Sequence, residues 1–122
     1  MSVADLVEKV GLFISARGLT KMDTFSNTDP FAVLYIKDLK TGNFVKAGRT
    51  ATVMDTQSPD FATQFILDYF FESVQEIAIK IFDKDGNSPE DRESAHELCG
   101  EVRFNLSTLM CSKNSAESPV WF

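Results

Sequence analysis

The sequence contains few of the residues on which catalysis and transition-metal binding most often depend. It has two cysteines and one histidine in 122 residues. Cys99 and Cys111 follow no disulfide framework, so we expect reduced thiols, and with His96 they make no zinc site at any usual ligand spacing. The histidine has no nucleophile motif beside it, and the chain has no phosphate-binding glycine loop. The sequence therefore predicts a protein that is not an enzyme.

Positive charge and long hydrophobic runs are scarce too. The 12 Lys and Arg residues stand against 18 Asp and Glu residues, which gives a net charge of −6. A general nucleic-acid binder needs a positive surface to displace counterions from phosphates, so this class is excluded. Asp5, Glu8, Lys9 and Arg17 interrupt the first twenty residues, which rules out a signal peptide or a membrane span there. We expect a soluble, intracellular chain.

What the sequence does contain is phenylalanine, with 11 residues, and a repeated alternation of apolar and polar positions. Aromatic side chains suit the half-buried surface of a β-sheet, and a period of two predicts strands. We expect strands over residues 10–16, 31–36, 44–52, 61–67, 77–82 and 99–106, one helical turn over 106–110, and a seventh strand over 119–122. In the second strand, Ala32, Leu34 and Ile36 are expected to form the inner face.

Six or seven short strands, turn signals about every ten residues and no amphipathic helix predict an antiparallel β-sandwich. The length fits one domain over residues 1–122, with no room for a second core. Hydrophobic residues make up 43% and charged residues 25% of the chain, as in ordinary globular proteins. The predicted fold class is therefore all-β.

Five carboxylates fall outside the predicted strands and next to strand ends. Asp23 and Asp29 lie between the first two strands, and Asp83, Asp85 and Glu97 lie between the fifth and the sixth. If both loops meet at one edge of the sandwich, like-charge repulsion costs on the order of a few kcal/mol. Calcium would remove that cost, because it takes about six to eight oxygen ligands and tolerates irregular loops. Taken singly, each aspartate also fits an ordinary turn or cap.

Several short motifs, in the right order and at fitting separations, resemble those of the C2 domain family. One set of motifs resembles the first calcium-binding region of that family: Gly18-Leu19, Asp23 and Thr28-Asp29-Pro30-Phe31. A second set, residues 81–85 with 98–101, resembles the third region. Ser58-Pro59-Asp60-Phe61 resembles the Asn-Pro-x-Phe entry to a strand of the family. The resemblance covers roughly residues 7–112, the core of the single predicted domain.

Two further segments, Gly48-Arg49-Thr50 and residues 68–75, resemble the first of the two C2 domains of copines. This resemblance implies eight strands in a permuted topology, in which the first strand leads directly into the first calcium loop. The chain supplies six or seven strands, and the eighth, which would follow Phe122, is expected to be absent. An uncovered edge beside the first strand is a template for pairing with another chain. We expect a less stable domain, a dimer through that edge, or residues 1–6 folded over it.

The resemblance also implies a set of calcium ligands. Four positions match four of the family's five calcium-binding aspartates, namely Asp23, Asp29, Asp83 and Asp85. Glu97 stands where the fifth aspartate is usual, and a glutamate keeps the charge but reaches one methylene further. The backbone carbonyls of Met22 and Lys84 complete the implied site.

The activity implied by the resemblance is calcium-dependent binding to anionic phospholipid membranes. Calcium would recruit the protein from the cytoplasm to the plasma membrane or to endosomes. Phe25 would insert at the membrane boundary, and Lys21 and Arg92 would contact lipid headgroups.

Two alternatives remain open. One is a calcium-independent protein–protein interaction module on the same sandwich, which would follow if Glu97 spoils metal binding. The other is an additional phosphoinositide site on the second and third strands, built from a loosely spaced set of cations, Lys37, Lys40, Lys46 and Arg49.

Overall fold

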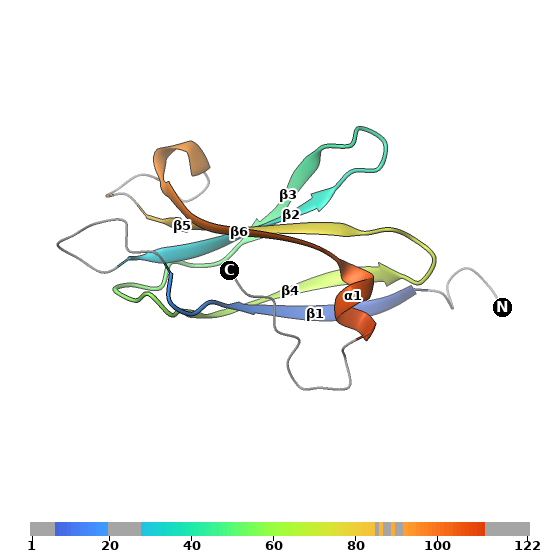
Figure 1. The fold of residues 1–122 in the computed structure, drawn as a ribbon, viewed down its shortest axis with the longest axis horizontal. Helices are drawn as coiled ribbons and strands as arrows, with labels where there is room; N and C mark the ends of the chain where they lie inside the picture. The colour runs from blue at the N-terminus through green and yellow to red at the C-terminus, as the bar shows by residue number, and fades with distance from the viewer. Residues whose placement is uncertain (1–6, 20–27, 85, 87–88, 90–91, 112–122) are drawn as a thin grey trace.

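The computed structural model describes residues 7–19, 28–84, 86, 89 and 92–111 of the chain. In that part the strands form two antiparallel sheets that lie face to face (Figure 1), which confirms the predicted all-β sandwich. The strands are Val7–Ser15 (β1), Pro30–Lys37 (β2), Phe44–Arg49 (β3), Asp60–Phe70 (β4), Glu76–Asp83 (β5) and Glu97–Asn105 (β6). A short 3-10 helix, Glu93–Ala95 (η2), precedes β6, and an α-helix, Leu106–Cys111 (α1), follows it where a helical turn was expected.

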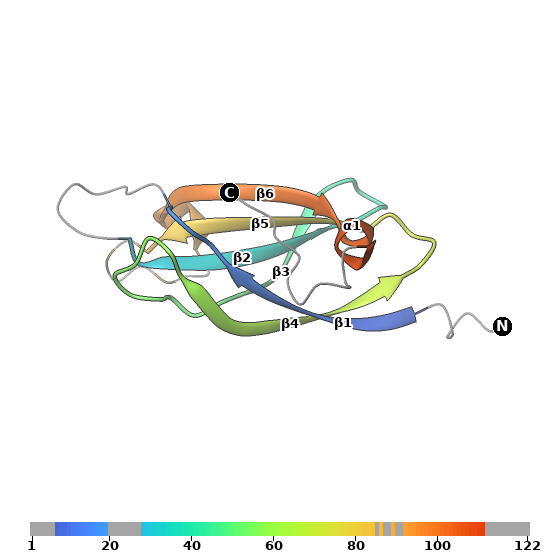
Figure 2. The ribbon, with the colours of Figure 1, turned by 60° about the horizontal axis from the view of Figure 1, so that its bottom comes forward.

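The order of the strands brings the functional end of the molecule together. Within the described residues, β3, β2, β5 and β6 form one sheet in that order, and β1 pairs with β4. The exit of β1, the entry of β2, the β3–β4 connection and the junction of β5 with β6 therefore lie at one end of the sandwich (Figure 2). The helix α1 lies at the other end. The described part of the chain contains no helix that could cross a membrane.

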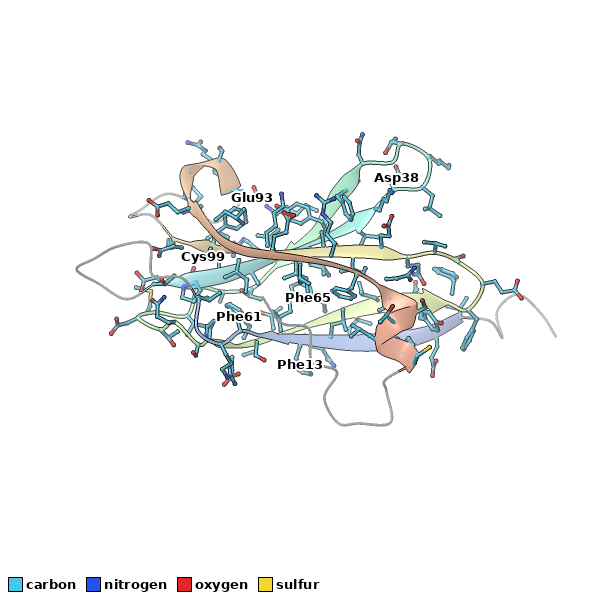
Figure 3. The ribbon with its side chains drawn as sticks, in the orientation of Figure 1. Phe13, Asp38, Phe61, Phe65, Glu93 and Cys99 are labelled. Atoms are coloured by element: carbon cyan, nitrogen blue, oxygen red, sulfur yellow. The ribbon has the colours of Figure 1, made fainter. Side chains whose placement is uncertain are left out.

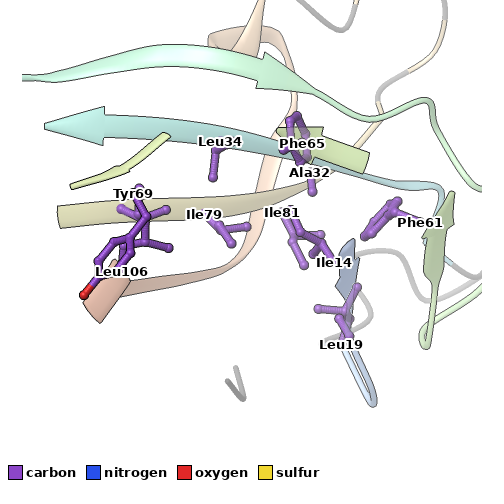
Figure 4. Close-up of a cluster of buried hydrophobic side chains, with 12 residues drawn as sticks. Ile14, Leu19, Ala32, Leu34, Phe61, Phe65, Tyr69, Ile79, Ile81 and Leu106 are labelled. Carbon is purple, nitrogen blue, oxygen red and sulfur yellow. The ribbon is translucent and has the colours of Figure 1, made fainter. Parts of the chain in front are cut away.

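Side chains from both sheets form the main core between the layers (Figure 4). Ile14 of β1, Phe65 of β4, Leu34 of β2 and Ile79 of β5 belong to this cluster, and so does Leu106, the first residue of α1. Complete burial of an aliphatic or aromatic side chain of this size contributes about 1.5–3 kcal/mol. The expected inner face of β2 is thereby confirmed for Ala32 and Leu34, both fully buried, while Ile36 is half-buried against the same cluster.

The second strand is buried on its outer face as well. Phe31 and Val33 pack there against Phe82 in a smaller cluster of their own. The rings of Phe31 and Phe82 stack with centroids 5.5 Å apart, and the ring of His96 meets Phe31 edge-on at 5.1 Å. Since the β5–β6 connection covers this face, β2 has a continuous apolar run and not an alternating one.

Every strand has at least one boundary that differs from the prediction, and β1, for example, covers Val7–Ser15 and not residues 10–16. β3 ends at Arg49 and not at residue 52, because Thr50 turns toward β2, where its hydroxyl accepts the Ala32 N–H at 2.9 Å. β4 continues to Phe70, paired with β1. Asp83 ends β5 and Glu97 begins β6, so both belong to strands and not to the loop in which they were expected. The predicted strand over 119–122 lies outside the described residues.

A substitution in the main core tests this packing. Leu34→Ala should lower the free energy of unfolding by about 2–5 kcal/mol, because the lost atoms leave a cavity between the sheets. Leu39→Ala is the matched control. Leu39 lies in the β2–β3 turn with 67% of its surface exposed, so its truncation should change stability by less than about 0.5 kcal/mol. Urea unfolding followed by circular dichroism measures both, and equal losses would contradict the core described above.

Candidate metal centre at the loop end

Asp29 and Asp83 lie together where the connections meet. The backbone N–H of Asp29 donates to Oδ1 of Asp83 at 3.0 Å. The N–H of Lys84 donates to the Asp29 carbonyl oxygen at 2.9 Å. The neighbouring residue Pro30 pairs with Asp83 across the sheet. These contacts join the entry of β2 to the exit of β5, so the two loops that the sequence analysis expected to meet do so at these aspartates.

Glu97 lies on the other side of Asp83. It is the first residue of β6 and is the pairing partner of Asp83 in the antiparallel ladder. Residues directly opposed in such a ladder share a face and have Cβ atoms about 4.5–5.5 Å apart. Strand pairing, and not a loop excursion, therefore brings this carboxylate beside Asp83, which corrects the prediction that Glu97 closes the loop.

Cys99 is affected by the charge at this end. It packs against the main core in the region where β6 begins (Figure 3), and its Sγ lies 3.8 Å from the Glu97 carbonyl oxygen. Burial, and after it the charges of Asp83 and Glu97, raise the pKa of the thiol to about 11. The thiol of Cys99 is therefore a poor nucleophile at neutral pH.

The connection between β5 and β6 is fastened to the outer face of the larger sheet. Glu93 of η2, labelled in Figure 3, forms an ion pair with Lys46 at 2.8 Å and accepts the Tyr35 hydroxyl at 3.3 Å. Nε2 of the buried His96 donates to the Pro89 carbonyl oxygen at 2.8 Å. These contacts hold the segment that leads into Glu97, and they fix the point at which β6 begins.

The β3–β4 connection also reaches this end, which the sequence analysis missed. The N–H of Asp55 donates to Oδ1 of Asp29 at 2.7 Å, and the N–H of Thr56 donates to the Thr28 carbonyl oxygen at 2.8 Å. Asp55 has a φ of 59°, in the left-handed region that Asp and Asn tolerate better than most residues. The presence of an aspartate at a position with positive φ is the only feature of the sequence that could have indicated this connection, because Asp55-Thr56 otherwise resembles an ordinary turn.

Several predicted contact residues lie outside the described residues, namely Lys21, Met22, Asp23, Phe25 and Asp85. Of those that are described, Lys84 follows Asp83 directly and Arg92 is exposed at the start of η2. The described part of the chain contains no group of three or more His, Cys, Asp or Glu side chains placed to hold a metal ion.

The donors that are described fit a hard cation. The carboxylate of Asp83 accepts the N–H of Asp29, and the strand partner of Asp83 is Glu97, so the acidic side chains near this point offer oxygen donors. Oxygen donors are the ligands that Ca²⁺ prefers, whereas zinc takes thiolate and imidazole. The chemistry of this donor set therefore fits calcium better than a transition metal.

The cations expected to form a basic strand are largely matched by nearby acceptors. Lys37 pairs with Glu76 at 2.8 Å, and Lys46 pairs with Glu93 at the same distance. The guanidinium of Arg49 donates to the carbonyl oxygen of the next residue at 3.3 Å. This face carries mixed charge, so the structure lends no support to a separate phosphoinositide site on it.

Comparison with known proteins assigns the family. A model of the C2 domain matches residues 12–122, which is most of the chain. The chain belongs to the C2 domain family. C2 domains are binding modules and not catalytic ones, and they commonly bind calcium and attach to phospholipid membranes or to proteins.

Two relatives of this C2 domain are copines of Dictyostelium discoideum. The chain is 32% identical to Copine-D over 106 residues and 34% identical to Copine-A over 110 residues. The matches cover 85% and 90% of this chain but 20% and 17% of those proteins, so the chain spans about a fifth of the length of these relatives. The resemblance to copines that the motifs indicated is confirmed.

Solved structures show the same fold. BON1-C2B superposes with a TM-score of 0.66 at 22% identity, over 93% of this chain and 78% of that one. The calcium-bound tandem C2 domains of Extended-Synaptotagmin 2 give 0.60 at 17% identity, over 87% of this chain and 36% of that one. These likenesses establish a C2-type sandwich.

Thiol alkylation tests the charge around Cys99. Because its pKa is raised to about 11, iodoacetamide at pH 8 should label Cys99 much more slowly than the exposed Cys111. Asp83→Asn removes one of the charges that raise this pKa, so labelling of Cys99 should become faster. Asp68→Asn, near the far end of β4, is the control and should leave labelling unchanged. Mass spectrometry gives the labelling rates of Cys99 and Cys111. If Asp83→Asn leaves the labelling rate of Cys99 unchanged, this electrostatic account is contradicted.

Proposed function

We propose that this C2 domain binds anionic phospholipid membranes when calcium is present. The observation that supports this most is the position of Asp83, hydrogen-bonded to the backbone of Asp29 on one side and paired with Glu97 on the other. Carboxylates gathered in this way repel one another unless a cation compensates them. The proposal is also supported by the family, whose members commonly bind calcium.

The residues that would hold calcium come from the β1–β2 connection, from the facing ends of β5 and β6, and from the connection between those two strands. They are Asp23, Asp29, Asp83, Asp85 and Glu97, with the backbone carbonyls of Met22 and Lys84. Bound calcium supplies positive charge that reverses the local potential, and it accepts phosphate or carboxylate oxygens of lipids as further ligands. The protein side chains hold the ion at the end of the sandwich, so a membrane would be met by this end.

The membrane contact would extend beyond the ion. Phe25 would enter the boundary between headgroups and acyl chains, while Lys21 and the exposed Arg92 would contact headgroup phosphates. The chain would reside in the cytoplasm at resting calcium and move to the plasma membrane or endosomes as calcium rises. In a longer copine-like protein, this module would carry the remaining domains with it.

Vesicle binding with matched variants tests the proposal. The wild-type chain should sediment with phosphatidylserine vesicles in millimolar calcium and not in chelator. Asp29→Asn and Asp83→Asn should each weaken calcium-dependent binding by about tenfold or more, because calcium affinity depends on the number of charged ligands. Both should leave the calcium-free fold intact, since they reduce like-charge repulsion.

The control for these variants is Asp68→Asn, which removes a carboxylate paired with Lys9 far from the loop end and should bind like the wild type. Vesicle binding that is equal in calcium and in chelator would refute calcium dependence. Absence of vesicle binding in both conditions would point instead to a protein-interaction module.

A second copy of the chain is a further partner that we propose. Within the described residues, β1 is hydrogen-bonded to β4 alone, and an uncovered edge strand offers unpaired backbone groups to another strand. Phe13 and Ile66 lie on the outer face of this pair of strands with 66% and 58% of their surfaces exposed. An apolar patch beside an open edge favours association.

Sedimentation velocity tests this association. We expect the chain to shift from monomer to dimer as its concentration rises through the micromolar range. Phe13→Lys places a charge in the patch and should move the equilibrium toward monomer. Leu39→Lys, an equally exposed position in the β2–β3 turn, should not. A chain that stays monomeric at hundreds of micromolar would show that the edge is already covered.

A further inference from the structure

Gln57 links the two ends of the β1–β2 connection through one side-chain amide. Its Nε2 donates to the Leu19 carbonyl oxygen at 2.6 Å, and its Oε1 accepts the N–H of Thr28. The backbone carbonyl oxygen of Gln57 also accepts the Leu19 N–H at 2.8 Å. Leu19 and Thr28 are both buried. A single residue of the β3–β4 connection therefore joins the exit of β1 to the entry of β2.

The hydrogen bonds continue from Gln57 to Asp29. Thr28 is held at its N–H by Gln57 and at its carbonyl oxygen by the Thr56 N–H, while the Asp55 N–H holds the carboxylate of Asp29. Three successive residues of one connection thus fix two successive residues of the other. Because the backbone before Asp29 is held on both sides, the direction of its carboxylate is set before any ion binds.

We propose that Gln57 is a positioning residue for the calcium site, acting through Thr28 and Asp29 and not on the ion itself. The inference rests on the proposed calcium-dependent function and names a residue that this function does not include. Ligands that are ordered in advance lose less conformational entropy when the ion binds. Residues that orient metal ligands typically change metal affinity by about tenfold to a hundredfold when they are replaced.

Gln75 provides a matched control at the opposite end of the sandwich. Its Oε1 accepts the Phe70 N–H at 2.9 Å, and its Nε2 donates to the Asp68 carbonyl oxygen at 2.7 Å. This is the same use of an amide, one donor and one acceptor against backbone groups, at the β4–β5 turn. Gln75→Leu should therefore lower the free energy of unfolding as Gln57→Leu does. The hydrogen bonds of Gln75 go to Phe70 and Asp68 and not to Thr28 or Asp29, so the calcium site should be unaffected.

The experiment compares Gln57→Leu, Gln57→Asn and Gln75→Leu with the wild type. Gln57→Asn keeps an amide but is one methylene shorter, so it cannot bridge Leu19 and Thr28 and yet remains compatible with a folded chain. Calorimetric titration with calcium alone gives the dissociation constant. Hydrogen exchange of the calcium-free protein reports protection of the Thr28 and Asp55 amides. Urea unfolding gives the stability of each variant.

We expect both Gln57 variants to raise the calcium dissociation constant about tenfold or more and to lose amide protection at Thr28 without calcium. Gln75→Leu should lose stability while keeping the wild-type constant within about twofold. If wild type binds calcium and the Gln57 variants match it, or if Gln75→Leu weakens calcium equally, the positioning role is overturned while the proposed function stands. A wild-type chain that takes up no calcium would overturn both.

Discussion

The pairing of β2 with β5 is the contact on which the core and the loop end both depend. β2 is buried on its two faces, with Ala32 and Leu34 toward the other sheet and Phe31 and Val33 toward the β5–β6 connection. A slip of one residue would exchange these faces, so the register is strongly specified. The same register sets Pro30 opposite Asp83. Apolar packing along the strands therefore decides which carboxylates meet at their ends.

Hydrogen bonds from the β3–β4 connection add what strand pairing does not supply at this end. On one side the Ala16 N–H donates to the Pro59 carbonyl oxygen at 3.0 Å, which holds the exit of β1. On the other, the Val53 N–H donates to the Pro30 carbonyl oxygen at 2.9 Å, which holds the entry of β2. One segment is therefore hydrogen-bonded to both flanks of the β1–β2 connection.

How far the sequence predicts this structure depends on whether a feature is local. The alternation in β1 and β5 and the turn signals that follow β5 and precede β2 are local, and they predicted that these strands exist, although not where each begins and ends. The continuous apolar run of β2 is consistent with burial on both faces, but the sequence does not show that a distant connection covers the outer face.

The candidate site shows the same division between local and long-range signals. Motifs that carry carboxylates, such as Thr28-Asp29-Pro30-Phe31, were visible because side-chain chemistry marks them. Asp55 acts through a backbone N–H, which every residue except proline possesses, and Gln57 through an amide that is common on surfaces. Glu97 was placed in the wrong element because its proximity to Asp83 arises from strand register, which a single sequence does not reveal.

The distribution of charge indicates which end of the molecule would face a membrane under the proposed function. Lys37, Lys46 and Lys80 on the larger sheet each pair with a glutamate, so that face offers little net attraction to an anionic surface. A chain with a net charge of −6 is repelled by such a surface as a whole, and most strongly where its carboxylates cluster. Calcium reverses the sign only where it binds, and screening limits the reach of that change to about 8–10 Å at physiological salt. The loop end would therefore be the only part of the described surface whose attraction to a membrane depends on calcium, so one docking orientation would follow from the position of the site.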